Sequence, residues 1–69
     1  MKKVDIYRPG IGIDTNTVSV VMENEGNFWR SKHIKKNEVL VSDYMIVEDR
    51  RYEIKDIYFD HDCITIVSE

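Results

Sequence analysis

The chain has 69 residues, a formal net charge of −3 and a single cysteine. This length holds one domain, expected to span residues 1–69, and its core must be thin because a chain of about 60 residues buries only ~60% of the surface exposed on unfolding. One cysteine excludes an internal disulfide, and no apolar run approaches the ~20 residues that a membrane span needs.

The first half of the chain predicts strands, because its apolar residues recur at every second position. Val4 and Ile6 share one face of the first strand. A proline and two glycines in "PGIGID" predict a turn or bulged loop at 9–14. Residues 17–34 are expected to form a hairpin around "ENEGN", and helix to be limited to one turn at "KKNEV".

The second half repeats this alternation. Two apolar runs flank residues 48–51, which predicts a turn where Asp49 is the residue best able to adopt a left-handed conformation. In "YEIKDIYFD" the apolar phase slips by one residue, which predicts a β-bulge or sharp bend near Lys55-Asp56. "DHD" then predicts the last turn, followed by a final strand in "CITIV".

Five or six short strands with tight connections predict an all-β fold, a small SH3-like barrel of antiparallel strands, with an OB-like barrel or a small β-sandwich as the alternative. The expected core consists of Val4, Ile6, Val18, Val20, Met22, Trp29 or Phe28, Ile34, Val39, Val41, Met45, Val47, Tyr52, Ile54, Ile57, Ile64 and Ile66.

Ionisable residues crowd into residues 47–62, yet most of them fall on predicted turns or on the solvent side of strands. His61 and Cys63 lack the ligand spacing of a zinc site, so no metal and no cofactor is expected. A Cys–His nucleophilic pair would need a third, orienting group, and a barrel this small leaves little room for a substrate pocket. The sequence therefore predicts no catalytic residues and no enzyme.

One segment, "FWRSKHIKKN", has the composition of a single-stranded nucleic-acid site, where rings stack on bases and cations follow the backbone. Phe28, Arg30 and Lys32 would share one strand face, with Lys35 and Lys36 in the following loop. The overall acidity opposes phosphate binding, so nucleic-acid binding is the alternative function.

Protein binding is the favoured function. Tyr7 and Tyr58 are expected to face outward, as are Val21 and one of Phe28 and Trp29, and tyrosine and tryptophan are frequent interface hot spots. A thin core together with exposed aromatic residues favours a protein partner or a homo-oligomer. A second contact candidate is an acidic face made of Glu48, Asp49, Asp56, Asp60 and Asp62.

Residues 39–67, "VLVSDYMIVEDRRYEIKDIYFDHDCITIV", resemble the C-terminal half of phage head–tail joining proteins, which are small SH3-like barrels. In that family a Gly-Asp pair precedes the hairpin and a glycine sits in its turn, whereas this chain has Ser42-Asp43 and Glu48-Asp49-Arg50. The resemblance implies a virion connector, or more broadly a phage or mobile-element protein. The competing role is a small inhibitor of a host protein, whose acidic face would replace nucleic-acid phosphates.

The expected location is cytoplasmic, in the host cytoplasm or in the virion if the protein is phage-encoded. The first residues contain lysines but no apolar segment of the kind that a signal peptide has, and no membrane association is expected.

Overall fold

The computed structural model describes residues 1–32, 42–61 and 63–69. In these residues the chain forms no helix and six strands, which are β1 (Lys2–Arg8), β2 (Thr15–Glu25), β3 (Phe28–Lys32), β4 (Tyr44–Val47), β5 (Arg50–Asp60) and β6 (Cys63–Ser68).

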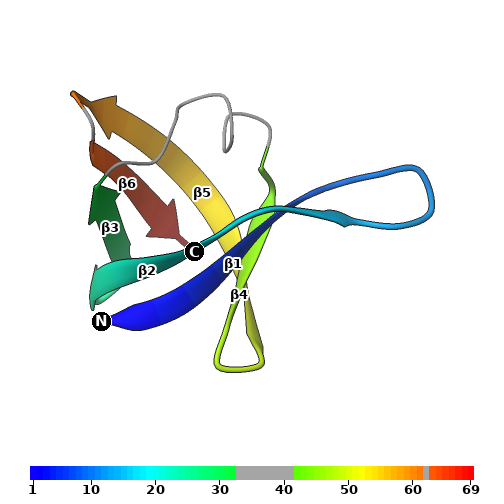
Figure 1. The fold of residues 1–69 in the computed structure, drawn as a ribbon, viewed down its shortest axis with the longest axis horizontal. Helices are drawn as coiled ribbons and strands as arrows, with labels where there is room; N and C mark the ends of the chain where they lie inside the picture. Colours follow the sequence, from blue (N-terminus) through cyan, green and yellow to red (C-terminus); the bar gives the residue numbers. More distant parts are fainter. Residues whose placement is uncertain (33–41, 62) are drawn as a thin grey trace.

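The strands form a closed antiparallel barrel in the order β1-β2-β3-β6-β5-β4, in which β4 returns to pair with β1 (Figure 1). The all-β prediction is therefore confirmed, and the architecture is consistent with a small SH3-like barrel. The helical turn expected at residues 35–39 lies outside the described residues.

The core lies inside the barrel, where the inward positions of the strands meet. Trp29 is its largest fully buried side chain, with 1% of its surface exposed. The predicted core residues that prove buried are Val4, Ile6, Met22, Trp29, Met45, Val47, Ile64 and Ile66. Val18, Val20, Tyr52, Ile54 and Ile57 pack against this core and are half-buried, while Ile34, Val39 and Val41 lie outside the described residues.

Ser68 is a buried residue that the apolar pattern does not predict. Its hydroxyl accepts a hydrogen bond from the indole Nε1 of Trp29 at 3.0 Å, and only 2% of Ser68 is exposed. The same hydroxyl donates to the carbonyl of Asn27 at 3.3 Å. Because a buried indole N–H needs an acceptor, Ser68 allows tryptophan to fill the core.

The predicted hairpin of residues 17–34 is correct only at its tip. Only Glu23–Glu25 of β2 pair with β3, whereas Thr15–Met22 pair with β1. An 11-residue strand is about 36 Å long, which exceeds what a five-residue partner can pair, so β2 leaves one sheet and enters the other.

The bend predicted near Lys55-Asp56 is confirmed. The register between β5 and β6 shifts between Ile54 and Asp56, and β5 pairs with β4 before this point and with β6 after it. A bulge sharpens the twist of a strand, and here it lets one long strand serve both halves of the barrel.

The turn between β4 and β5 contains two residues with left-handed backbone, Glu48 (φ 51°) and Asp49 (φ 65°). Asp49 was predicted to adopt this conformation, and the structure adds Glu48. Val47 pairs with Arg50 across the turn, so the loop has the two residues and the positive φ angles of a type I′ hairpin.

Candidate functional site

The outward side chains of β2, β3, β6 and β5 form a continuous surface, the outer sheet face. Phe28 and Tyr58 are its largest apolar side chains, with 52% and 56% of their surface exposed. The cross-strand register aligns its residues in rows. One row contains Glu25, Phe28, Val67 and Asp56, the next Glu23, Arg30, Thr65 and Tyr58, and the third Lys32, Cys63 and Asp60.

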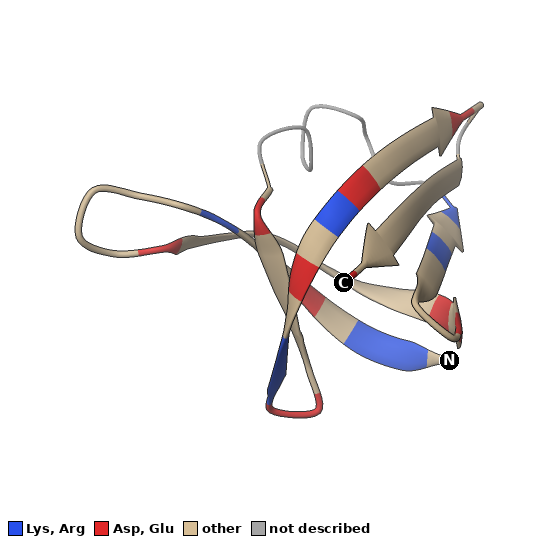
Figure 2. Cartoon of the chain, turned by 180° about the vertical axis from the view of Figure 1, so that it is seen from behind, with Lys and Arg blue, Asp and Glu red and all other residues tan. Residues whose placement is uncertain are grey.

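Charges on the outer sheet face are separated by strand. β3 carries Arg30 and Lys32, whereas the outward positions of β5 carry Asp56 and Asp60, with the uncharged outward residues of β6 between them (Figure 2). Within the described part of the chain, none of these four side chains forms an ion pair with another of them. The surface therefore presents basic residues on β3 and acidic residues on β5, on opposite sides of β6.

The charge balance of this surface is negative. Glu23 and Glu25 of β2 join the two aspartates of β5, so four acids stand against the two bases of β3 and leave −2. Arg30 contacts the Cys63 thiol through Nη2, at 3.9 Å from Sγ. The cations of β3 thus have the acidic residues of β2 on one side and the uncharged strand β6 on the other.

The residues predicted for nucleic-acid binding are partly brought together. Phe28, Arg30 and Lys32 are exposed on one face of β3, whereas Trp29 points into the core, which identifies Phe28 as the outward aromatic residue. Lys35 and Lys36 lie outside the described residues.

The predicted acidic face is divided into separate groups. Glu48 and Asp49 occupy the β4–β5 turn, at the start of β5, while Asp60 ends that strand. These two groups therefore lie at opposite ends of an 11-residue strand. Asp56 and Asp60 share the outer sheet face, and Asp62 lies outside the described residues.

The two predicted contact tyrosines differ in exposure. Tyr58 is exposed on the outer sheet face, at the β5 end of the middle row. Tyr7 is half-buried because its ring stacks on Tyr44, with centroids 5.1 Å apart and planes inclined by 3°. The guanidinium of Arg51 covers the Tyr44 ring at 3.8 Å from its centroid, so Tyr44 is enclosed in a stack on the outside of the barrel.

Hydrogen bonds at this stack shift two pKa values. The hydroxyl of Tyr44 donates to Asp14, and this bond, together with desolvation, raises the pKa of Tyr44 above its ordinary value. A hydrogen bond from Arg51 Nε to Glu53, at 2.7 Å, raises the pKa of Arg51. Tyr44 is therefore neutral, and Arg51 charged, across the physiological range.

The connection between β1 and β2 forms a second surface, the hairpin tip (residues 9–14), which projects away from the barrel (Figure 1). Ile11 is fully exposed and Ile13 is 80% exposed. Sequence reasoning treated this segment only as a turn and missed its apolar side chains. The available signal was two isoleucines that alternate with glycines in Gly10-Ile11-Gly12-Ile13, where turns normally carry polar residues.

The hairpin tip has a defined shape. The amide of Gly10 donates to the carboxylate of Asp14 at 3.4 Å, and Asp14 also accepts the hydroxyl of Tyr44. A Cβ atom at Gly10 would lie 2.1 Å from the carbonyl oxygen of Ile13, so only glycine fits this close approach. The two isoleucines are thus presented by a loop that is tied to the barrel.

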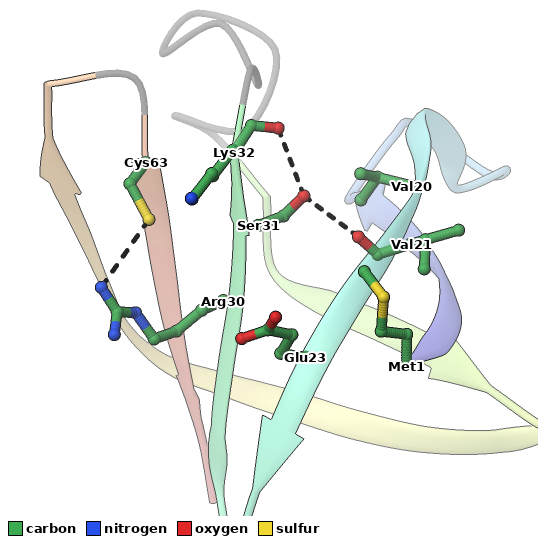
Figure 3. Close-up of a pocket in the computed structure, with 8 residues that line it drawn as sticks. All are labelled: Met1, Val20, Val21, Glu23, Arg30, Ser31, Lys32 and Cys63. Atoms are coloured by element: carbon green, nitrogen blue, oxygen red, sulfur yellow. Dashed lines mark hydrogen bonds between the residues drawn. The ribbon is translucent and has the colours of Figure 1, made fainter.

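A pocket of about 650 Å³ lies on the outer sheet face, between β2 and strands β3 and β6 (Figure 3). Within it Ser31 donates to the carbonyl of Val21 at 3.1 Å, and Cys63 has Arg30 as its side-chain contact. In the described residues no three metal-ligating side chains gather. The pocket is lined by Met1, Val20, Val21, Glu23, Arg30, Ser31, Lys32 and Cys63.

No known protein family matches this chain, and no curated protein or solved structure matches it. The described residues also contain no helix of the length and hydropathy needed to span a membrane.

Proposed function

We propose that this protein is a non-enzymatic protein–protein interaction module, and that it engages its partner through the hairpin tip. The observation that carries this proposal is the nearly complete exposure of Ile11 and Ile13. Isolated apolar residues on a surface are common, but two isoleucines on a projecting loop form an apolar end that water solvates poorly.

The shape of the loop supports this role. The contacts of Asp14 with Gly10 and Tyr44 tie the loop backbone to the barrel, whereas the side chains of Ile11 and Ile13 lie outside the core. A loop that is ordered before binding loses less conformational entropy when it docks. An apolar end on such a loop suits a pocket or groove in another protein.

The free energy that Ile11 and Ile13 gain on burial limits the affinity that the hairpin tip can provide. Full burial of one isoleucine contributes about 1.5–3 kcal/mol, so two contribute ~3–6 kcal/mol before the costs of association. This amount gives at most a weak complex, since a dissociation constant of 1 μM needs about 8 kcal/mol. The tip therefore acts as an anchor beside further contacts with the partner.

Two biological roles suit such a module. One is a virion connector of a phage or mobile element, as the resemblance of residues 39–67 implies, and the other is a small inhibitor of a host protein. Both require a compact barrel that presents a fixed contact surface, and neither requires a catalytic site.

Affinity capture from a lysate of the native host tests the proposal, with nuclease-treated and untreated samples compared by mass spectrometry. The wild type should recover the same protein in both samples, and an Ile11→Ser/Ile13→Ser variant should lose it. The matched control is Ile11→Val/Ile13→Val, which keeps the tip apolar and should retain capture. Equal recovery by the serine variant would exclude the tip as the contact.

Single-stranded nucleic-acid binding is the second candidate, and the alignment of Phe28, Arg30 and Lys32 on β3 favours it. The charge of −2 on the outer sheet face opposes it, because phosphate binding relies on a net basic surface. Titration with a single-stranded oligonucleotide should show affinity that falls steeply with salt if this candidate is correct. Recovery that vanishes after nuclease treatment would point the same way.

A further inference from the structure

On β3, β6 and β5 the outer sheet face carries two bases and two acids. Arg30 and Lys32 of β3 and the outward Asp56 and Asp60 of β5 lie on opposite sides of β6, whose outward side chains are the uncharged Cys63, Thr65 and Val67. Arg30, Lys32 and Asp56 find no opposite charge within salt-bridge distance in the described part of the chain. A second copy with the same pattern in reverse order would place Asp60 opposite Lys32.

We propose that the outer sheet face binds a second copy of this chain, in a symmetric dimer whose two-fold axis runs parallel to β6. A rotation of 180° about this axis places β5 of the second copy over β3 of the first, and the converse. The rotation does not change positions along the strand direction, because the axis is parallel to the strands. Each row of one copy therefore faces the same row of the other copy.

Two of the three rows then bring complementary groups together, and in the third row Phe28 of each copy faces Asp56 of the other. Lys32 and Asp60 belong to one row, so Lys32 of each copy faces Asp60 of the other. Arg30 and Tyr58 belong to the next row, so each guanidinium faces a tyrosine ring, an arrangement that cation–π attraction favours. Every contact occurs twice, because the interface is symmetric.

Apolar side chains lie within the same area. Phe28 and Tyr58 are about half exposed, and Val67 lies between them on β6. Strand spacing and rise give this area a footprint of roughly 19 × 17 Å. That is small beside the ~800 Å² that each partner buries in a standard interface, so the dimer should dissociate in the micromolar range or above. The hairpin tip lies outside this surface, so dimer formation and tip binding are independent.

Sedimentation equilibrium of the full chain over micromolar to millimolar concentrations tests the dimer. The wild type should associate, and Lys32→Glu and Asp60→Lys should each raise the dissociation constant by ~10-fold or more, since like charges then meet at two places. An equimolar mixture of the two variants should regain the wild-type constant, because each variant carries the charges that the other needs. Arg8→Glu, which lowers the net charge as much as Lys32→Glu does but outside this face, should associate as the wild type does.

Cross-linking tests the orientation of the dimer. An axis parallel to β6 places Cys63 of the two copies close together, so a short bismaleimide should join them in the wild type and not in Lys32→Glu. A wild type that stays monomeric at millimolar concentration would overturn the proposal, as would a mixture of variants that fails to associate or a dimer that the reagent does not join. The Ile11→Ser/Ile13→Ser variant should dimerise normally, which separates this result from the test of the tip.

Discussion

Replacement of Ser68 by alanine should destabilise the barrel strongly for so small a change. The substitution removes the acceptor of the Trp29 indole, which lies 3.0 Å from the serine oxygen in a site where both residues are almost fully buried. A buried donor left without a partner costs about 1–3 kcal/mol. The whole fold is worth roughly 3–10 kcal/mol for a chain of this length, so Ser68→Ala should remove a large fraction of the stability.

Urea denaturation followed by tryptophan fluorescence measures this effect directly, because Trp29 is the only tryptophan in the chain. A loss of 2 kcal/mol should lower the melting temperature by about 8–16 °C in a domain of this size. Ser31→Ala is the matched control, since the Ser31 hydroxyl bonds to the carbonyl of Val21 at a site that water can reach. It should change stability by less than ~0.5 kcal/mol.

A double-mutant cycle separates the hydrogen bond from the packing of the indole. Trp29→Phe removes the donor and part of the buried ring, and circular dichroism replaces fluorescence as the readout. If the hydrogen bond from Trp29 to Ser68 stabilises the fold, Ser68→Ala should lower the free energy of unfolding by about 1 kcal/mol less in the Trp29→Phe background than in the wild type. Additive effects, or a Ser68→Ala variant as stable as Ser31→Ala, would refute the reasoning.

Two further predictions concern the β4–β5 turn and the tyrosine stack. Glu48→Asn/Asp49→Gly should stabilise the barrel by about 1 kcal/mol, because both positions have positive φ and Asn-Gly is the preferred type I′ pair. Thermal denaturation should show a higher melting temperature for this variant, and an unchanged melting temperature would contradict the prediction. The raised pKa of Tyr44 means that its hydrogen bond to Asp14 stabilises the fold fully below pH 10 and is lost as the pH rises through the raised pKa. Urea denaturation should therefore show an alkaline loss of stability that is smaller in Tyr44→Phe, and equal losses in the two proteins would exclude this source.

The fold was predictable because its signals are local. Alternating apolar residues identified the buried positions of β1 and β6, such as Ile6 and Ile64, and the phase slip at Lys55-Asp56 located the bend of β5. The pairing of β2 was predicted only in part, since the choice between β1 and β3 as its partner depends on how the barrel closes. Ser68 was missed for a related reason, because its burial follows from the position of a tryptophan 39 residues away.

The candidate surfaces were harder to predict than the fold. Alternation correctly placed Phe28, Arg30 and Lys32 on one strand face, but it could not show that β6 separates them from Tyr58 and Asp60. The order of strands in the barrel, which creates the opposed basic and acidic strands, comes from long-range pairing. The net charge of a segment can be read from the sequence. Which charged side chains lie next to one another depends on the order of the strands in the barrel.

The hairpin tip and the closure of the barrel depend on the same residues. β1 and β4 pair through only three residue pairs, and the last of these joins Tyr7 to Tyr44, the two rings that stack on the outside of this seam. Tyr44 also holds Asp14, and Asp14 holds the amide of Gly10 at the base of the tip. A change that opens the seam would therefore release the loop that presents Ile11 and Ile13. In this barrel the shape of a proposed contact surface is maintained by the residues that close the fold.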